Sequence, residues 1–208
     1  TKFHFNEGHT GGLELTNYFH YTGQGGAPHL REFTDEEGLT YTLKAMRKMG
    51  WSDKKIDKVL ALTAGLLHLG QVSFSPGEVN GEESSEIHDE NAKSVAYAAA
   101  LIGVDVESLT SALTQRIMEA RGERMTLVLN CARALDARDA LTKTIYGAMF
   151  LWVVQQVNDC IIWSNPSEKV NSVGVLDIFG FESFAVNSFE QLCINFTNEA
   201  LQQQFNKF

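Results

Sequence analysis

The chain has 208 residues, of which 44% are hydrophobic and 21% are charged, a composition typical of a globular protein with a buried core. Its formal net charge of −9 argues against a general nucleic-acid-binding protein, which normally carries an excess of basic residues. The longest apolar runs are too short for a direct membrane span, and no secretory signal pattern opens the chain.

The first thirty or so residues contain two Gly-Gly pairs and many aromatic side chains without a clear period, which predicts mostly loop with one short helix. A longer helix should follow Thr34, whose side chain can form a capping box with Glu37, and this helix should end at Gly50. Ser52 is the expected N-cap of the next helix, which should end at Gly70.

A short strand is predicted for residues 72–74. The segment that follows, residues 76–91, carries six acidic side chains and no Lys or Arg. Because like charges repel each other and stay hydrated, we expect a solvated surface loop. A calcium site is the alternative, but the segment lacks the alternating Asp and Asn ligands around a central Gly that such loops have.

Helices, a hairpin and a long helix are predicted next. A helix over residues 89–102 should stop at the glycine that follows it, and a shorter helix should cover residues 105–113. Two partly alternating arms around Gly122 indicate a β-hairpin over residues 116–129. From residue 132 to 163 the apolar residues recur at helical spacing without a Pro, which predicts one helix of about thirty residues, about 45 Å long.

The run Val173–Ile178 is nearly all apolar and contains Asp177 near its end, which suits a strand buried on both faces of a sheet. Ser188 and Gln191 can then form a second capping box that opens a helix. The predicted fold class is α/β, predominantly helical, with a few strands that enter a shared sheet.

The first residue is Thr1 rather than Met, so we expect the chain to be cut from a longer one. Its three cysteines form no Cys-x-x-Cys pair, and its six histidines are scattered. We therefore expect reduced thiols, as in a cytosolic protein, and no metal site built by these residues.

The stretch from Asp177 to Glu182 carries recognisable chemistry. In doubly wound nucleotide enzymes the ligand lies beyond the C-terminal ends of the strands. An Asp there can accept hydrogen bonds from water bound to Mg²⁺, and a Gly, here Gly180, lets the backbone N–H approach a phosphate. The short pattern is common by chance, and an Asp at an ordinary strand-to-turn transition is the alternative.

A longer string is far more specific. Residues 176–182, Leu-Asp-Ile-Phe-Gly-Phe-Glu, and residues 187–206, which begin Asn-Ser-Phe-Glu-Gln-Leu, closely resemble switch II and the relay helix of the myosins. Residues 139–143, Asp-Ala-Leu-Thr-Lys, and residues 66–70, Leu-Leu-His-Leu-Gly, resemble earlier motifs of that family in the right order. The resemblance covers about residues 13–208, and the first dozen residues match least.

This resemblance implies a role for each residue of switch II. Asp177 would help to organise the water shell of Mg²⁺, and the amide of Gly180 would contact the γ-phosphate of ATP. Glu182 would pair with an Arg of switch I, a segment that this sequence does not contain, to close the site around the attacking water. Ile178 and Phe179 would complete the nucleotide-contacting loop. An ordinary surface carboxylate is the alternative for Glu182.

The resemblance also assigns the helix after switch II to the start of the relay helix. Packed helices shift between discrete arrangements, so this helix could pass a small movement of switch II to a distant element. Plain core packing is the alternative for each single residue. The expected relay residues are Ser188, Phe189, Asn195, Glu199 and Phe205.

The hairpin would be an actin-contacting loop. Arg116, Arg121 and Arg124, set against Glu119 and Glu123, give it a slight positive excess, which would favour the acidic surface of actin. Glu123 falls where the family carries an acidic or phosphorylatable residue, which suggests that phosphorylation of this loop is not needed. A solvated hairpin charge is the alternative, because hairpin tips are generally polar.

Over residues 1–208 the chain would thus be a partial motor domain of the P-loop NTPase type, and its switch II strand would join a central mixed sheet. The expected parts are helices of the upper fifty-kilodalton region at 1–115, the actin-facing hairpin at 116–129, the long helix at 132–163, the switch II strand and loop at 173–187, and the start of the relay helix at 188–208.

The phosphate-binding loop, switch I, the converter and the light-chain-binding helix are absent from the sequence, so this piece alone should not hydrolyse ATP. The complete motor would use ATP and Mg²⁺, bind actin filaments, bind light chains or calmodulin through a downstream neck, and work in the cytoplasm at the actin cytoskeleton. Thr142, where the family usually has Ala, and Gln204, where His is common, indicate a divergent or unconventional member.

Two other functions stay open on the sequence. A degenerate myosin-like domain could bind actin or another partner without turnover, and an intact phosphate-binding loop in the parent chain would argue against it. A different nucleotide switch, such as a kinesin or a small GTPase, shares Asp-x-x-Gly but should lack the string at residues 187–206.

Overall fold

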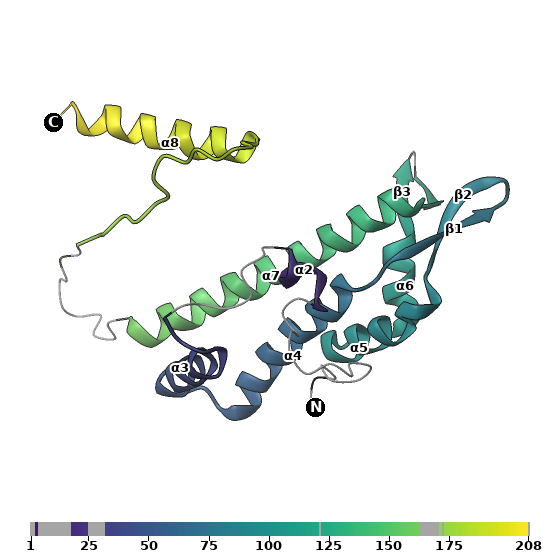
Figure 1. Ribbon diagram of the computed structural model, residues 1–208, viewed down its shortest axis with the longest axis horizontal. Helices are drawn as coiled ribbons and strands as arrows, with labels where there is room; N and C mark the ends of the chain where they lie inside the picture. The colour runs from purple at the N-terminus through teal and green to yellow at the C-terminus, as the bar shows by residue number, and fades with distance from the viewer. Residues whose placement is uncertain are drawn as a thin grey trace. The chain divides into compact units, whose positions relative to one another are not determined.

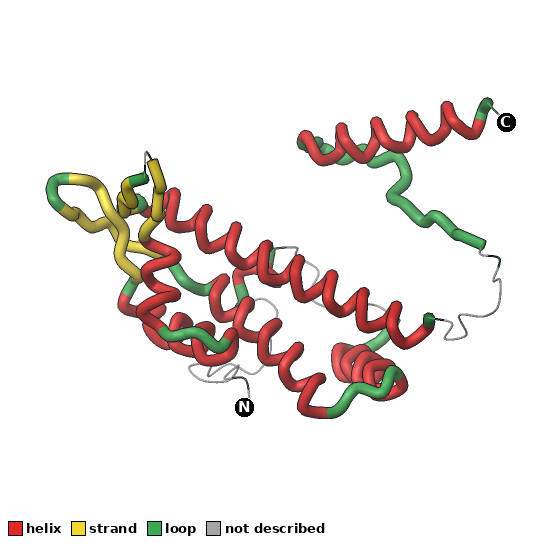
Figure 2. The backbone as a smooth tube through the Cα atoms, turned by 180° about the vertical axis from the view of Figure 1, so that it is seen from behind, coloured by secondary structure: helices red, strands yellow, loops and turns green. Residues whose placement is uncertain are grey.

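The computed structural model describes residues 3, 18–24, 32–120, 122–162, 171 and 173–207 of the chain. They belong to two compact units, residues 1–162 and residues 163–208, which we call unit 1 and unit 2. The chain is mostly helical, as predicted. Its described strands form two separate antiparallel sheets of two strands each (Figure 2), so the expectation of one shared sheet is not met within these residues.

Unit 1 contains both sheets and the helices up to α7, and unit 2 contains α8 (Figure 1). The bounds are α2 His20–Gly23, α3 Asp35–Lys48, α4 Asp53–Gly70, β1 Phe74–Val79, β2 Glu82–Ile87, a short 3-10 helix Asp89–Asn91, α5 Ala92–Ile102, α6 Val106–Thr114, β3 Gln115–Ala120, β4 Glu123–Val128, α7 Cys131–Ile161 and α8 Phe189–Phe205.

The predicted helix caps of unit 1 are confirmed. The Thr34 hydroxyl accepts a hydrogen bond from the Glu37 N–H at 3.2 Å, and the Glu37 carboxylate accepts one from the Thr34 N–H at 2.8 Å. Ser52 caps α4 by accepting a hydrogen bond from the Lys55 N–H. Gly103 directly follows α5 in the left-handed conformation, with φ of 89°. The long helix predicted from residue 132 is confirmed as α7.

The core of unit 1 lies where α4, α5 and α6 meet. Full burial of one aliphatic side chain contributes about 2 kcal/mol to stability, so this cluster holds the three helices together. Its buried members are Leu69, Val72, Val95, Ala98, Ala99, Leu109 and Leu113. Among the described residues, no single helix is long and apolar enough to cross a membrane. The bent pair of residues 89–102 and 106–114, at 111° to each other, meets that test by length and composition alone.

The prediction of a solvated loop for residues 76–91 is wrong, because most of the segment forms the β1–β2 hairpin. Asn80 and Gly81 form its two-residue turn, with positive φ values of 53° and 81°. A type I′ turn requires positive φ at both positions, and Asn-Gly suits it best. The strand predicted for residues 72–74 begins only at Phe74.

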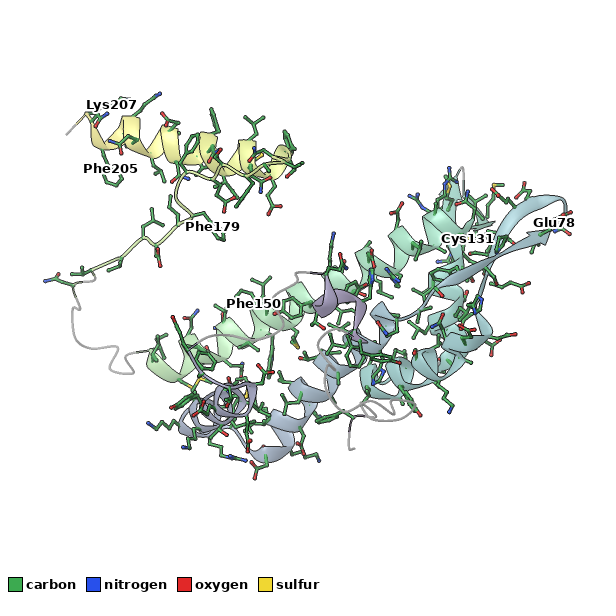
Figure 3. All side chains as sticks on the ribbon, viewed as in Figure 1. Glu78, Cys131, Phe150, Phe179, Phe205 and Lys207 are labelled. Carbon is green, nitrogen blue, oxygen red and sulfur yellow. The ribbon has the colours of Figure 1, made fainter. Side chains whose placement is uncertain are left out.

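One serine fastens this acidic hairpin to the rest of unit 1. Ser85 is buried, and its hydroxyl donates a hydrogen bond to the Leu129 carbonyl at 2.7 Å. Ser84 is buried beside it without a hydrogen-bond partner among the described residues, so it contributes packing. Glu78 and Glu83 lie opposite each other across the hairpin, where like charges are unfavourable, so these anchoring contacts have to offset the repulsion. The two hairpins lie at the same end of α7 (Figure 1), and Figure 3 marks Glu78 near the tip of β1.

A buried polar cluster joins α7 to the end of α4. The Arg138 side chain donates hydrogen bonds to the carbonyls of Gly70 and Val72 at 3.2 and 2.7 Å. Arg138 also pairs with Asp139 at 2.7 Å, and the Tyr21 hydroxyl donates to Asp139 at 2.6 Å. Because the last carbonyls of a helix lack partners within it, these contacts complete the end of α4 and fix α2 beside it.

The two titratable groups beside Arg138 in this cluster, Tyr21 and Asp139, have pKa values that differ from their ordinary ones. Burial, followed by the hydrogen bond to Asp139, raises the pKa of Tyr21. Partial burial by itself raises the pKa of Asp139, but hydrogen bonds from Tyr21 and Arg138 outweigh it and hold that pKa below its ordinary range. The Thr142 hydroxyl lies 3.3 Å from the Tyr21 hydroxyl, whose one proton goes to Asp139, and it donates a hydrogen bond to the Arg138 carbonyl at 2.8 Å. This departure from the pattern of the family that the sequence resembles therefore has polar partners.

In unit 2 the chain forms neither helix nor strand from residue 173 to 187, bends at residues 185 and 186, and then enters α8. The buried strand predicted for residues 173–178 is not formed: Val173 and Val175 are 93% and 92% exposed. A strand needs a hydrogen-bonded neighbour, and the described residues offer none to this segment. The second capping box is confirmed, because Ser188 and Gln191 bond reciprocally at the start of α8.

Candidate functional site

The three residues predicted to act in catalysis lie on the exposed segment of unit 2 that precedes α8. Asp177 and Gly180 are exposed, whereas Glu182 is half-buried where the segment meets α8. Ile178 and Phe179 are exposed between them, and Figure 3 marks Phe179 on this segment. The Asp177 carboxylate and the Gly180 backbone are therefore open to a ligand that arrives from outside the unit.

The backbone conformation of this chain does not require a glycine at position 180. Gly180 is not among the described glycines with positive φ, and a Cβ atom built on it meets no atom within 4 Å. Neither the backbone nor a neighbouring side chain therefore excludes Ala at this position. A close approach by a group outside unit 2 is the remaining physical reason for a Gly here.

In this region Asp177 offers a magnesium ion an exposed carboxylate, and Glu182 carries a half-buried one. Among the residues that it describes, no three His, Cys, Asp or Glu side chains gather into a metal site. Asp177 by itself fits a water-mediated role, since Mg²⁺ keeps several of its waters and commonly takes its other ligands from substrate phosphates. The chain therefore fits part of a magnesium site and not a complete one.

Asn195 fastens the loop to α8, and this contact was not predicted from the sequence. The Glu182 N–H donates to Asn195 Oδ1 at 2.7 Å, and Asn195 Nδ2 donates to the Glu182 carbonyl at 2.8 Å. Both backbone groups of one residue are thus held by one side-chain amide, two turns into the helix. Asn195 was expected only as a member of the relay helix. A single Asn in a helix carries no sequence signal for a partner thirteen residues away.

The chain between Glu182 and α8 is fixed as well. The Phe184 N–H donates to Asn187 Oδ1 at 2.9 Å, and Asn187 Nδ2 donates to the Phe184 carbonyl at 2.7 Å. Ser188 then caps the helix, and Gln191 lies 3.5 Å from the Glu182 carboxylate. A displacement of the Glu182 backbone would therefore pull directly on the N-terminal half of α8.

The other predicted relay residues are exposed. Phe189 begins α8 and Phe205 ends it, and both side chains are largely exposed, as is Glu199 (Figure 3). Leu192 and Phe196 are 63% and 73% exposed between them. An exposed row of large apolar side chains on one helix marks an interaction surface, so α8 has the character of a helix that packs on something else.

Arg116 and Arg124, two of the predicted actin-contacting residues, lie on opposite faces of the β3–β4 hairpin. Arg116 lies opposite Leu127 on one face of the β3–β4 hairpin, whereas Arg124 lies opposite Glu119 on the other and pairs with it at 3.5 Å. Arg121 lies outside the described residues. The backbone of Glu123 pairs with Ala120, and its side chain is not described.

The sequence analysis did not predict that apolar residues of the same hairpin are exposed. Ile117, Met118 and Met125 are 68%, 42% and 55% exposed, and the last two lie opposite each other. The alternation of the two strands could have shown them, since every second residue of a hairpin shares a face. Met118 and Met125 share the face of Arg116, and Ile117 shares the other face with Arg124, so each face sets exposed apolar surface beside a charged side chain. Such a mixture is the usual make-up of a protein interface.

Comparison with known proteins places these features in a family. Residues 6–208 match the family described as myosin head (motor domain). The chain is 39% identical over 200 residues to unconventional myosin-Ic of Danio rerio, which covers 93% of this chain and 19% of that protein. It is 41% identical over 190 residues to myosin-17 of Arabidopsis thaliana, covering 91% of this chain and 12% of that protein. It is 38% identical over 194 residues to unconventional myosin-Va of Gallus gallus, covering 93% of this chain and 10% of that protein.

Proposed function

Because this chain belongs to the myosin head (motor domain) family, we propose that it is an internal part of an actin-based motor that couples hydrolysis of Mg-ATP to movement along actin filaments. The chain spans less than a fifth of the length of the curated relatives it matches, so this function is that of a larger parent protein. The observation that carries the proposal is the open segment with Asp177 and Gly180, fastened through Glu182 to α8.

In this proposal, residues 177–182 act as switch II. Asp177 accepts hydrogen bonds from water on Mg²⁺, which neutralises phosphate charge when it is bound. The Gly180 N–H donates to the γ-phosphate, and the lack of any neighbour around Gly180 leaves room for that approach. Glu182 is half-buried and pairs with an Arg supplied by the parent chain, which closes the site around the attacking water.

The helix α8 acts as the start of the relay helix. The two hydrogen bonds between Glu182 and Asn195, at 2.7 and 2.8 Å, make the loop and the helix move together. The exposed Phe189, Phe196 and Phe205 contact the parent chain and pass the movement on. This division of labour suits packed helices, which change between discrete arrangements rather than bending continuously.

The apolar run at residues 173–178 pairs with strands of the parent protein. Its Val173 and Val175 side chains, at 93% and 92%, are the most exposed large apolar groups among the described residues of unit 2, and burial of such groups is the main driving force for association. The run would then be the switch II strand of a central sheet, which this chain alone does not complete.

Unit 1 supplies the actin-facing surface. The β3–β4 hairpin, with Arg116, Arg124 and the exposed methionines, contacts actin filaments, and Arg121 and Glu123 are the further contacts that the sequence suggests. The parent protein works in the cytoplasm at the actin cytoskeleton and binds light chains or calmodulin through a neck outside this chain. Without the phosphate-binding loop and switch I, the chain alone is inactive.

Steady-state ATPase of the intact parent protein, with and without actin filaments, tests the proposal. We expect actin to activate turnover and Gly180→Ala to lower it by about a hundredfold, because a methyl group displaces the phosphate from the backbone N–H. Gly147→Ala is the matched control: it also meets no atom within 4 Å, but it lies in α7. Actin binding without any turnover would instead identify a non-catalytic interaction domain.

A further inference from the structure

The end of unit 1 opposite the two hairpins is rich in basic residues, although the whole chain is acidic. There α3, the start of α4 and the C-terminal half of α7 come together (Figure 1). Residues 44–58 carry six of the chain's 17 Lys and Arg but only two of its 26 Asp and Glu. A chain with a net charge of −9 thus concentrates positive charge at one corner.

A hollow of about 500 Å³ lies at this corner between α4 and α7. Its volume is in the range of sites that bind small molecules or anchoring side chains. Apolar side chains from both helices contribute to its walls, and three lysines from the start of α4 surround them. The lining residues are Ser52, Lys54, Lys55, Lys58, Val59, Leu62, Met149 and Trp152. We call this hollow the lysine cradle.

Lys55 is held in place within the lysine cradle. Its ammonium lies 4.6 Å from the ring centre of Trp51 and 5.0 Å from that of Trp152, and it donates a hydrogen bond to Gln156. The two indoles are 5.5 Å apart, and Trp51 is buried. Two cation–π contacts fix the charge in space, so little side-chain entropy remains to be lost when an anion binds.

The positive charge of the lysine cradle is not neutralised within the part of the chain that the structure describes. The ion pairs of these residues join Arg47 to Asp53, Arg124 to Glu119 and Arg138 to Asp139, and none includes a lysine of the cradle. An ammonium has three donors, and Lys55 uses one of them on Gln156. The cradle therefore presents a fixed, half-buried cation beside an apolar floor.

We propose that the lysine cradle binds an acidic segment of a partner protein, with one apolar side chain in the hollow and a carboxylate on Lys55. The apolar floor requires an apolar anchor, and the ring of Lys54, Lys55 and Lys58 requires negative charge next to it. A concave hollow suits a protruding side chain and not the flat face of a membrane. A charge-assisted hydrogen bond on a preplaced cation supplies specificity as well as affinity.

This interaction is independent of the proposed ATP hydrolysis, since it uses no residue of unit 2. Its test is binding of a labelled peptide to the intact parent protein, followed by fluorescence anisotropy. The probe is a tryptophan-free helical peptide with a central Leu flanked by Glu residues. A second readout is the protein's own tryptophan emission, because Trp152 lines the hollow.

We expect Lys55→Gln to weaken peptide binding by about tenfold, the loss of one charge-assisted hydrogen bond. Lys58→Gln, a change at an exposed position that leaves the packing intact, should weaken it by a smaller factor. Lys44→Gln is the matched control, because Lys44 is exposed on α3 and does not line the hollow. Lys55→Arg keeps the cation and should retain most of the affinity.

Two altered peptides complete the test. Replacing the Glu residues by Gln should abolish binding, and replacing the central Leu by Ser should remove the change in tryptophan emission. Equal binding by the parent protein and its Lys55→Gln variant, or equal binding of the charged and uncharged peptides, would overturn the proposal. It would also be overturned if phosphatidylserine vesicles, but not the peptide, bound in a Lys55-dependent manner.

Discussion

Units 1 and 2 begin their helices with the same local signals but bury their apolar residues very differently. A capping box opens α3 in unit 1 and another opens α8 in unit 2. Yet Leu113 in unit 1 is fully buried, whereas Leu192 in unit 2 is 63% exposed. Local sequence therefore determines where a helix starts, and only long-range contacts determine whether its apolar face is covered.

The contrast has a functional meaning. Unit 1 has its own core and its own buried polar cluster, as a stable support should. Unit 2 has an open loop, a fastening between Glu182 and Asn195, and a helix with uncovered aromatic side chains. Elements that move in response to a ligand come from the less stable parts of proteins, and unit 2 fits that description.

The largest effect should come from shortening one leucine in each unit. Leu113→Ala should lower the free energy of unfolding of the chain by about 3 kcal/mol, because it leaves a cavity in the core. Leu192→Ala should change it by less than about 0.5 kcal/mol, because that side chain is exposed. Urea unfolding followed by tryptophan emission measures both. Equal costs would show that unit 2 is packed like unit 1.

The next effect concerns two ion pairs of unit 1. Arg138→Met should cost about 3 kcal/mol, because it removes the cation that pairs with Asp139 and leaves the carbonyl of Val72 without its donor. Arg124→Met should cost less than about 0.5 kcal/mol, since its pair with Glu119 is well exposed. The same urea measurement applies. If Arg138→Met were as mild as Arg124→Met, the polar cluster would not support unit 1.

A smaller effect should appear in the pH dependence of unit 1. The pKa of Tyr21 is raised, so its contribution to stability is complete below about pH 10 and is lost as pH rises through the folded-state value. The pKa of Asp139 is lowered, so its contribution is present above about pH 4 and is lost as pH falls through the folded-state value. The melting temperature, measured as a function of pH, should fall both at acid pH and at alkaline pH; we call these two losses the acid limb and the alkaline limb.

Tyr21→Phe separates the two limbs. It should remove the loss of stability at alkaline pH that comes from Tyr21, and it should weaken the loss at acid pH, because Asp139 then lacks one hydrogen-bond donor. An unchanged alkaline limb in Tyr21→Phe would assign that limb to other groups.

The smallest effect compares the two capping boxes. Thr34→Ala and Ser188→Ala should each cost their helix about 1 kcal/mol. The first turn of α8 should fray more than that of α3, because α3 packs against α4, whereas α8 is the one helix described in unit 2 and has no second helix of that unit to pack on. Hydrogen exchange of the first-turn amides, with Ser188→Thr as the control that keeps the cap, measures this. Equal fraying would mean that α8 is held by more than its cap.

The sequence predicted the helices well because their signals are local. Thr34, Ser52 and Ser188 each cap the helix assigned to them. The acidic hairpin was missed because the prediction rested on the six carboxylates of residues 76–91, of which the hairpin holds four, and not on the Asn80-Gly81 turn, although that pair is a strong hairpin signal. Charge repulsion is weak between hydrated side chains, and the turn together with the hydrogen bond of the buried Ser85 outweighs it.

The rest of the site could not have been predicted from one sequence. A strand at residues 173–178 depends on neighbouring strands that the sequence does not contain. Its apolar pattern therefore predicted that the segment is hydrophobic, but not whether it forms a strand. The fastening of Glu182 by Asn195 depends on how a loop folds back on a helix, and no spacing rule encodes that. The basic residues of the β3–β4 hairpin could be counted, but only the register showed that Arg124 lies opposite Glu119.

Hydrogen exchange in the intact parent protein, with and without an ATP-state phosphate mimic, is the most direct test of the coupling between the loop and α8. We expect the mimic to slow exchange both at residues 178–182 and in the N-terminal half of α8. In Asn195→Ala the loop should still respond, whereas α8 should no longer follow it. Gln202→Ala, an exposed amide near the end of the same helix, should behave like the wild type. A response of α8 that is unchanged in Asn195→Ala, or a loop that ignores the mimic, would contradict the account.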